Sequence, residues 1–216
     1  GGILVTDNRK FFERALLLSD FGPRIKNEIR FKNYKKYNET GLGFKHRIHP
    51  ASAAIANNEL KKINFYIKRR HRMLNHLSSE IKKIVGMSPP ITRKFTNRGA
   101  YYGYRPFYDR KKLNNISIDN FIKILQAEGM EVRRSSHSPL HLLPLFSKKK
   151  NGAYFLHKKY DRYKNYKNGD LPKCEKFYNS TLSLPTFTFE KKELVNQYIK
   201  AFKKVCDFLS KNKIKM

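Results

Sequence analysis

The segment 41–58, GLGFKHRIHPASAAIANN, constrains the fold most, because it joins a glycine-rich basic turn to a long helical pattern. Pro50 suits the first position of a helix, where its missing N–H is not needed. Beyond it, six apolar residues recur at spacings of three, four or seven: Ile63, Ile67, Leu74, Leu77, Ile81 and Ile84. This period is typical of a helix with one buried face, so the sequence predicts a rigid helix that ends near Val85.

The turn before this helix carries three cationic or potentially cationic side chains, Lys45, His46 and Arg47. The free backbone N–H groups at a helix start add partial positive charge, so the turn favours an anion. The alternative is an amphipathic helix that follows an ordinary turn. The residues by themselves leave both interpretations open.

Length and composition allow a folded core: 216 residues can form one large domain or two small ones, and 39% are hydrophobic. The sequence has no apolar run of about 18 residues, so we expect no membrane-spanning helix. Cys174 and Cys206 show no metal-ligand spacing and no disulfide framework, and we interpret them as buried small side chains in a reducing, cytoplasmic setting. The chain begins with Gly-Gly and not with Met, which favours a fragment or a processed product.

The net charge of +30 would attract nucleic acid, a membrane surface or a phosphorylated substrate. The 47 lysines and arginines are scattered, however, with short clusters at 148–150 and 158–159. The sequence shows no basic arm, zinc finger or RNA-recognition signature. A nucleic-acid-binding module is therefore an alternative function but not the leading one, and we expect no membrane partner.

Strands and helices alternate after residue 99, which predicts a compact α/β lobe. Before it we expect a buried strand in 1–7 and a helix from Arg9 to the Gly22-Pro23 stop. Residues 24–40 should form a loop, with or without an edge strand. The apolar face of that helix should comprise Phe11, Phe12, Ala15, Leu16 and Leu18. A proline- and glycine-rich break at 86–98 should separate two packed units. The lobe should contain strands at 99–109, 130–132 and 182–185, helices at 118–128, 172–180 and 191–209, and a basic loop at 148–170.

Two histidines, His137 and His141, stand four residues apart in HSPLHLLPLF. The prolines prevent a regular helix and no carboxylate accompanies them, so we predict no metal site. They are either loop histidines that line a cleft or ordinary packed or solvated histidines. The sequence offers neither a serine nucleophile elbow nor a glycine-rich phosphate loop.

The ordered motifs resemble the DegT/StrS type of pyridoxal-phosphate-dependent sugar aminotransferases. GGILVTD at 1–7 is similar to the turn and strand that follow the active-site lysine, and GFKHRI at 43–48 is similar to the loop G-Y-N-Y-R-M. The helix and strand R-D-x-x-x-x-x-L-x-x-x-G-I resemble ISIDNFIKILQAEGMEV. Further similar motifs are Ala53-Ala54 to Glu59-Leu60, Arg69-Arg70, Ser138-Pro139-Leu140-His141, and Leu171-Pro172-Lys173-Cys174-Glu175 to Leu182-Ser183-Leu184-Pro185. The match covers essentially the whole chain in order.

The resemblance implies an α/β chain that is the C-terminal part of a fold-type I pyridoxal-phosphate-dependent transferase. Residues 1–60 would end the large cofactor-binding domain, 61–86 would form the long bridging helix, and 87–216 would form the small C-terminal α/β domain. The whole protein would be a homodimer that uses pyridoxal 5′-phosphate. It would move an amino group from glutamate, or glutamine, to a keto-sugar that is linked to a nucleotide.

The resemblance also implies site residues. Lys45 matches the family's asparagine that reaches the cofactor phosphate across the dimer, and an ammonium still suits a phosphate as a point charge. Arg47 matches the arginine of the same loop. His141 matches the histidine near the substrate pocket, and His137 is a second candidate for substrate binding. The Schiff-base lysine would lie upstream of Gly1, so we expect no catalytic residue here and no transamination by this chain alone. A non-catalytic relative that acts in regulation or assembly is a further alternative.

Overall fold

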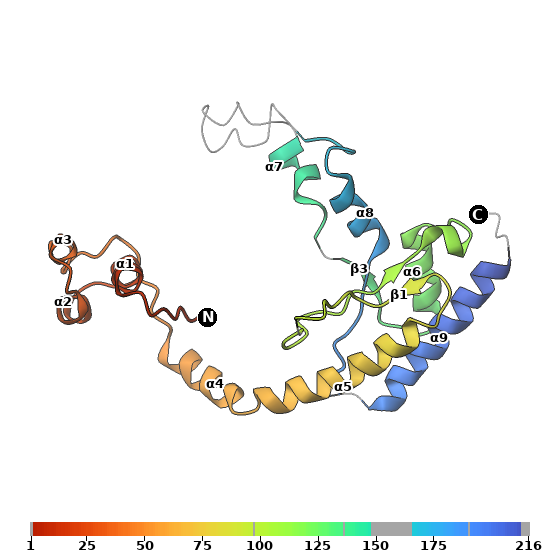
Figure 1. The fold of residues 1–216 in the computed structure, drawn as a ribbon, viewed down its shortest axis with the longest axis horizontal. Helices are drawn as coiled ribbons and strands as arrows, with labels where there is room; N and C mark the ends of the chain where they lie inside the picture. The colour runs from red at the N-terminus through yellow and green to blue at the C-terminus, as the bar shows by residue number, and fades with distance from the viewer. Residues whose placement is uncertain (1, 97, 136, 148–165, 190, 213–216) are drawn as a thin grey trace. The chain divides into compact units, whose positions relative to one another are not determined.

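The computed structural model describes residues 2–96, 98–135, 137–147, 166–189 and 191–212. It divides the chain into two compact units, Gly1–Ile63 and Asn64–Met216, which are described separately below. The elements of both units are labelled in Figure 1. The predicted three-part division at residues 60 and 86 stays a prediction.

Four helices form the first unit: α1 (Arg9–Ser19), α2 (Pro23–Glu28), α3 (Lys32–Lys35) and α4 (Pro50–Leu60). Asn8 caps α1, because its side chain accepts hydrogen bonds from two backbone N–H groups of the first turn. The prediction of a loop over 24–40 is wrong, since α2 and α3 lie in it. Pro23 starts α2 at a position where proline is favoured, and burial of Ile25 stabilises this short helix.

The buried face of α1 differs from the predicted one. Glu13, Leu16, Leu17 and Asp20 are buried, whereas Phe11 and Leu18 are exposed. The three of these that lie in α1, Glu13, Leu16 and Leu17, follow the spacing i, i+3, i+4 of one helix face, and Asp20 comes directly after the helix. The prediction missed this face because one of its members, Glu13, is a carboxylate. The small core around it consists of Leu16, Leu17, Ile25 and Ile29, with Phe12, Tyr34 and Tyr37 packed against them.

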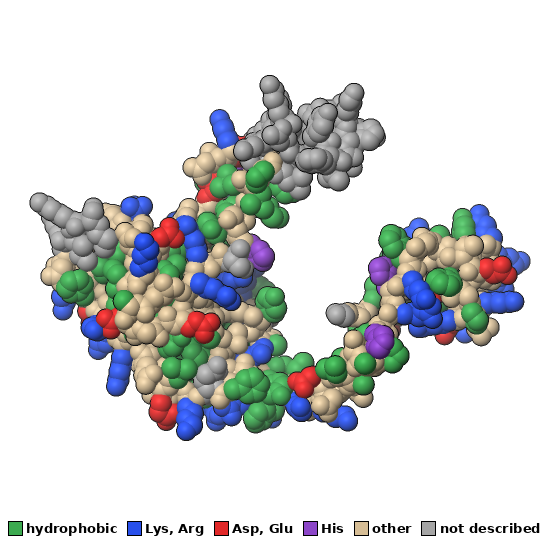
Figure 2. All heavy atoms as spheres, turned by 180° about the vertical axis from the view of Figure 1, so that it is seen from behind, with side chains coloured by type: hydrophobic (Ala, Val, Ile, Leu, Met, Phe, Trp, Pro, Cys, Tyr) green, Lys and Arg blue, Asp and Glu red, His purple; other side chains and the backbone are tan. Residues whose placement is uncertain are grey.

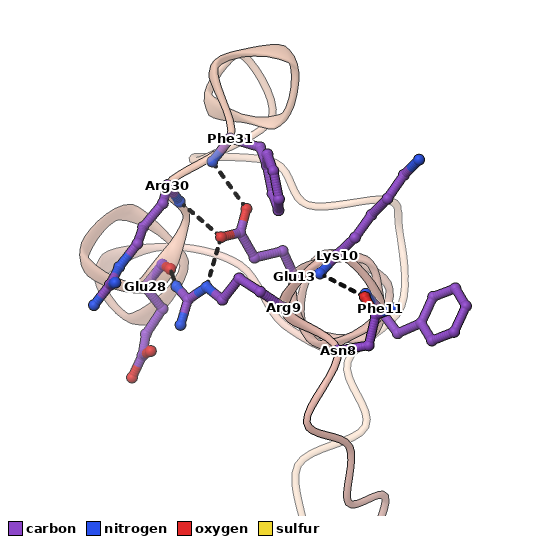
Figure 3. A network of polar contacts seen from close by, with 8 residues as sticks. All are labelled: Asn8, Arg9, Lys10, Phe11, Glu13, Glu28, Arg30 and Phe31. Carbon is purple, nitrogen blue, oxygen red and sulfur yellow. Dashed lines mark hydrogen bonds and ion pairs between the residues drawn. The ribbon is translucent and has the colours of Figure 1, made fainter.

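Glu13 is fully buried and links α1 to the connection between α2 and α3 (Figure 3). Its carboxylate accepts hydrogen bonds from Arg9 Nε at 2.8 Å, from the backbone N–H of Arg30 at 3.0 Å and from that of Phe31 at 3.1 Å. Burial raises the pKa of Glu13, but these hydrogen bonds outweigh it, so the pKa lies below its ordinary value. Every buried charge needs such partners.

The predicted buried strand in 1–7 is wrong for the described residues of this segment. Residues 2–6 form no strand, and the side chains of Ile3, Leu4 and Val5 are exposed. A strand needs a neighbouring strand to satisfy its backbone N–H and C=O groups, and none of the described strands pairs with this segment. The apolar composition of this run is typical of a strand, but composition does not supply a neighbouring strand.

The predicted single helix from Pro50 to Val85 is two helices, α4 and α5 (Ile63–Ile81), with Lys61 and Lys62 in a turn between them. In α4 no described residue is buried. In α5 the predicted positions Leu74, Leu77 and Ile81 are buried, and Met73 is buried beside them. The apolar period that predicted one long helix therefore belongs to α5, apart from Ile84, which is buried beyond the end of this helix.

Short strands and three long helices form the second unit. The strand β1 (Met87–Ser88) pairs antiparallel with β2 (Phe107–Tyr108), and β3 (Arg133–Arg134) pairs antiparallel with β4 (Leu182–Ser183). Single bridges join Tyr104 to Leu184 and Phe107 to Thr181, which connects the two ladders. The other elements are η1 (Arg110–Leu113), α6 (Ile118–Ala127), η2 (Leu140–Leu142), α7 (Pro144–Ser147), α8 (Pro172–Ser180) and α9 (Lys192–Lys211).

The predicted α/β lobe is confirmed, with shorter strands than expected. Ser117 caps α6 as predicted, because its hydroxyl accepts from the N–H of Asn120. The strand predicted at 130–132 lies at 133–134 instead. Met130 and Val132 are buried in the core, so this apolar run serves packing and the next two residues pair with β4.

One continuous hydrophobic cluster fills the second unit, from Met73 in α5 to Leu209 in α9. Its fully buried members include Leu74, Phe121 and Phe202, one from each long helix. The break at 86–98 does not separate two hydrophobic clusters in the described residues, since Ile84 and Met87 lie in the same cluster as the residues that follow. A proline-rich connection can run over the surface of one core as well as between two.

Cys206 is buried as predicted, and burial raises the pKa of its thiol to about 12. Cys174 is exposed, contrary to the prediction, because α8 has no buried residue. No helix of the described residues is long and apolar enough to span a membrane. Of the predicted basic loop at 148–170, residues 148–165 lie outside the described part of the chain, and so do the lysine clusters at 148–150 and 158–159.

Candidate functional site

The basic segment 42–47 runs along the C-terminal end of α1. The N–H of Leu42 donates to the carbonyl of Leu17 and that of His46 to the carbonyl of Ser19, both at 2.7 Å. The last carbonyls of a helix lack partners within it, so the segment satisfies groups that α1 leaves open. Gly41 makes this approach possible: its φ is +59°, and a Cβ there would lie 2.3 Å from the carbonyl oxygen of Asp20.

The extended backbone after Gly43 sends alternate side chains to opposite sides. Phe44 and His46 stack with their ring centroids 5.4 Å apart. Lys45 and Arg47 meet at another aromatic ring, that of Phe21. The Lys45 Nζ lies 5.4 Å and the Arg47 Cζ 5.7 Å from the ring centroid. The two predicted cofactor-binding cations are thus brought together.

Asp20 lies next to Phe21 and pairs with one of these cations. Its Oδ1 is 3.3 Å from Arg47 Nε, and its side chain is 5% exposed. The same oxygen accepts a hydrogen bond from the backbone N–H of Phe21 at 2.9 Å. The site therefore consists of two exposed cations, one ring and one buried carboxylate, with the cations in excess by one charge.

The start of α4 is less open to an anion than the sequence suggested. His49 caps the helix through Nδ1, which accepts from the N–H of Ala51 at 3.3 Å. Pro50 has no N–H to offer. Any anion near the loop is therefore met by the side chains of Lys45 and Arg47 more than by the helix start.

The second predicted site lies in the other unit. His141 is 5% exposed, and its Nε2 is 2.8 Å from Glu175 Oε1 on α8. Glu175 also accepts hydrogen bonds from the backbone N–H groups of Gly169 at 3.0 Å and Leu171 at 3.3 Å. The hydrogen bond with His141, followed by those with Gly169 and Leu171, holds the pKa of Glu175 below its ordinary value although partial burial raises it.

The structure does not bring the two histidines to one point. His137 is exposed in a bend, whereas His141 is buried in η2. The structure therefore agrees with the interpretation of ordinary packed or solvated histidines. His141 is packed and has a carboxylate partner, and His137 is solvated. The described residues contain no group of three or more histidine, cysteine, aspartate and glutamate side chains that could hold a metal.

Sequence reasoning missed Asp20, Phe21 and Glu175. Asp20 and Phe21 lie at the predicted end of a helix, and their spacing does not link them to a loop more than twenty residues later. The sequence analysis quoted Glu175 as part of a motif but assigned no role to it. The Arg69-Arg70 pair of that motif set is structural: Arg69 Nε donates to the carbonyl of Thr188 at 2.9 Å and Arg70 Nε to its hydroxyl at 2.6 Å.

On the face drawn in Figure 2, the described Lys and Arg side chains are dispersed among apolar, acidic and uncharged atoms. They do not form one stripe there. A nucleic-acid-binding protein would be expected to gather them along one face.

The comparisons with known proteins agree with the motifs. An uncharacterized protein of Methanocaldococcus jannaschii is 25% identical over 214 residues, which are 95% of this chain and 49% of that protein. The spore coat polysaccharide biosynthesis protein SpsC of Bacillus subtilis is 23% identical over 207 residues, again 95% of this chain and 49% of the relative. The chain therefore spans about half the length of the curated relatives it matches.

The crystal structure of DesV from S. venezuelae is similar with a TM-score of 0.66 and 20% identity, covering 94% of this chain and 46% of that one. The predicted fold class, part of a fold-type I pyridoxal-phosphate-dependent transferase, is confirmed. A model of the DegT/DnrJ/EryC1/StrS aminotransferase family matches residues 1–203, and the chain belongs to that family.

Proposed function

We propose that this chain is part of a pyridoxal-phosphate-dependent sugar aminotransferase. The whole protein moves an amino group from glutamate or glutamine to a keto-sugar that carries a nucleotide, and it acts as a homodimer. Membership of the family supports the reaction class. The relative from Bacillus subtilis, which is named for polysaccharide biosynthesis, supports a sugar as the acceptor.

The observation that carries the proposal is the pair of cations on the Phe21 ring. A phosphate ester has up to two negative charges at neutral pH, and an ammonium beside a guanidinium matches both its charge and its several acceptor oxygens. The donor set thus fits the phosphate of pyridoxal 5′-phosphate, which supplies an electron sink when bound. Lys45 and Arg47 hold that phosphate and so orient the cofactor.

In this proposal His137 and His141 bind the sugar substrate. Glu175 pairs with Nε2 of His141, and in this proposal Nδ1 accepts a hydrogen bond from a substrate hydroxyl. His137 is exposed and can use either ring nitrogen. The carboxylate fixes the orientation of His141, as carboxylate partners do in other histidine sites.

The lysine that carries the cofactor matches no position of this sequence, and we assign it to another part of the protein. This chain alone should not transaminate. The family match does not favour the alternatives, a nucleic-acid-binding protein and a non-catalytic relative.

The test joins this chain to the lysine-bearing half and follows the visible absorbance of the bound cofactor. Adding glutamate should shift the band, and a nucleotide-linked keto-sugar should restore it. The free keto-sugar and glutamine serve as separate arms that report on the nucleotide and the donor. A band that never forms, or one that no amino donor shifts, would contradict the proposal.

The role of Lys45 is tested in the same assembled protein. Lys45→Ala should lower cofactor retention on a desalting column. Lys36→Ala is a matched control, because Lys36 also lies over an aromatic ring of the first unit, 5.0 Å from Tyr37. Equal retention in the two variants would remove Lys45 from the site.

A further inference from the structure

The two cations at Phe21 repel each other and must be held together by something other than the anion they bind. The ring is the shared contact: Lys45 Nζ and Arg47 Cζ both lie within 6 Å of its centroid. The negative face of an aromatic ring attracts a cation even at an exposed site. Phe21 is 43% exposed, so it is accessible to both side chains.

Asp20 supplies the second restraint. It follows the last residue of α1, and a carboxylate is unfavourable there because the end of a helix carries partial negative charge. The last turn of α1 contains no basic residue that could compensate it. Arg47 provides the missing positive charge from the neighbouring segment, at 3.3 Å.

The ion pair with Asp20 uses only the Nε of Arg47. The two Nη nitrogens lie at the other edge of the planar guanidinium and can bind a second anion. The backbone hydrogen bonds from Leu42 and His46 to the end of α1 fix the segment that carries both cations. Ring, carboxylate and backbone thus preorganise one anion-binding pair.

We propose that Phe21 and Asp20 are positioning residues that hold Lys45 and Arg47 side by side for a phosphate dianion. The inference rests on the proposed function, in which that dianion belongs to the cofactor. It adds that the affinity for phosphate depends on a side chain that never touches the phosphate. Phe21 acts on the cations, and Asp20 orients the guanidinium of Arg47.

The experiment titrates the intact chain with inorganic phosphate and with pyridoxine 5′-phosphate while backbone amide NMR signals of residues 41–48 are followed. Pyridoxine 5′-phosphate has no aldehyde and cannot react with the many lysines. Phe21→Leu should weaken the site-specific affinity about threefold to fivefold. Phe31→Leu is the matched control, because Phe31 is also 43% exposed in the same unit but contacts Tyr34. It should leave the affinity unchanged.

A second readout reports on Asp20 without relying on affinity. Asp20→Asn keeps an oxygen that can accept the Phe21 N–H but removes the charge, so the Arg47 Nε–H should exchange with water several times faster. An unchanged exchange rate would remove Asp20 from the arrangement.

The outcomes separate this inference from the proposed function. Weaker binding by Lys45→Ala with unchanged binding by Phe21→Leu would overturn the inference and leave the phosphate role of Lys45 intact. Unchanged binding by Lys45→Ala would overturn both. Signal changes spread over many basic residues of wild type, with none concentrated at 41–48, would also overturn the inference.

Discussion

The two units of this chain solve the problem of a stable core in different ways. In the second unit, α5, α6 and α9 bury a continuous apolar cluster that includes Phe121 and Phe202. In the first unit four buried aliphatic residues make a small core. The face of α1 that contributes to it also carries Glu13, and the buried Asp20 follows the helix. A small core needs further restraints, and here these are hydrogen bonds to carboxylates.

This difference indicates which contacts can orient a functional side chain. A buried carboxylate fixes the direction of its partners, whereas an apolar contact fixes mainly their distance. Asp20 orients Arg47, and in the second unit Glu175 orients His141 in the same manner. Arg47 and His141 are thus each paired with a carboxylate, whereas Lys45 contacts an aromatic ring.

The largest effect should come from the apolar core. Phe202→Ala should destabilise the second unit by about 3–5 kcal/mol, because it removes a fully buried ring and leaves a cavity. Phe208→Ala on the same helix is the control, since Phe208 is exposed and its loss should cost less than about 1 kcal/mol. Hydrogen exchange of peptides from each unit would show whether the protection of the first unit stays unchanged, as expected.

Two glycines allow a matched comparison between the units. Gly41 and Gly86 both have positive φ, but a Cβ on Gly41 would meet the backbone oxygens of Asp20 and Leu17, whereas one on Gly86 would meet the Leu113 side chain. Side chains can shift and a helix end cannot. Gly41→Ala should therefore cost about 3 kcal/mol and release the basic segment, and Gly86→Ala about 1–2 kcal/mol. Urea denaturation that ranks them the other way would refute this reasoning.

A smaller effect is expected from the polar network. Glu13→Gln should destabilise the first unit by about 2 kcal/mol, because the amide cannot accept hydrogen bonds with both of its ends. Glu59→Gln is the control at an exposed ion pair with Lys62. The measurement is the free energy of unfolding from hydrogen exchange of the first unit.

The same carboxylate predicts a pH dependence. The pKa of Glu13 is lowered in the folded chain, so its contribution is complete above the ordinary value of about 4.5 and is lost as the pH falls through the lower folded value. Acidification should thus loosen the first unit in wild type, and Glu13→Gln should reduce that dependence. An unchanged pH profile in the variant would show that Glu13 is not the responsible group.

The sequence predicted the parts of this structure that follow from apolar period and capping. Ser117 as the cap of α6 and Pro172–Ser180 as α8 are examples, since each depends on local chemistry. The prediction from sequence failed where a polar residue is buried in the core and where a strand depends on a neighbouring strand. The predicted face of α1 is wrong because the carboxylate Glu13 belongs to the buried face of this helix. Ile3 to Val5 form no strand because composition cannot provide a neighbouring strand.

The candidate site was predictable to a similar extent. A family motif led to Lys45 and Arg47, and the alternation of an extended segment puts them on one side. Their meeting at Phe21 required the fold, because the ring comes from the end of α1. The pairing of His141 with Glu175 was equally invisible, since 34 residues separate them in the sequence.

The most direct test of the account is the ³¹P NMR signal of the cofactor in the assembled protein, measured between about pH 5 and 8. A phosphate ester loses its second proton with a pKa of about 6, and two adjacent cations keep it a dianion. The account predicts a chemical shift that is constant over this range in wild type and titrates in Lys45→Ala. A shift that titrates equally in both, or in neither, would contradict the assignment of Lys45 and Arg47 to the phosphate.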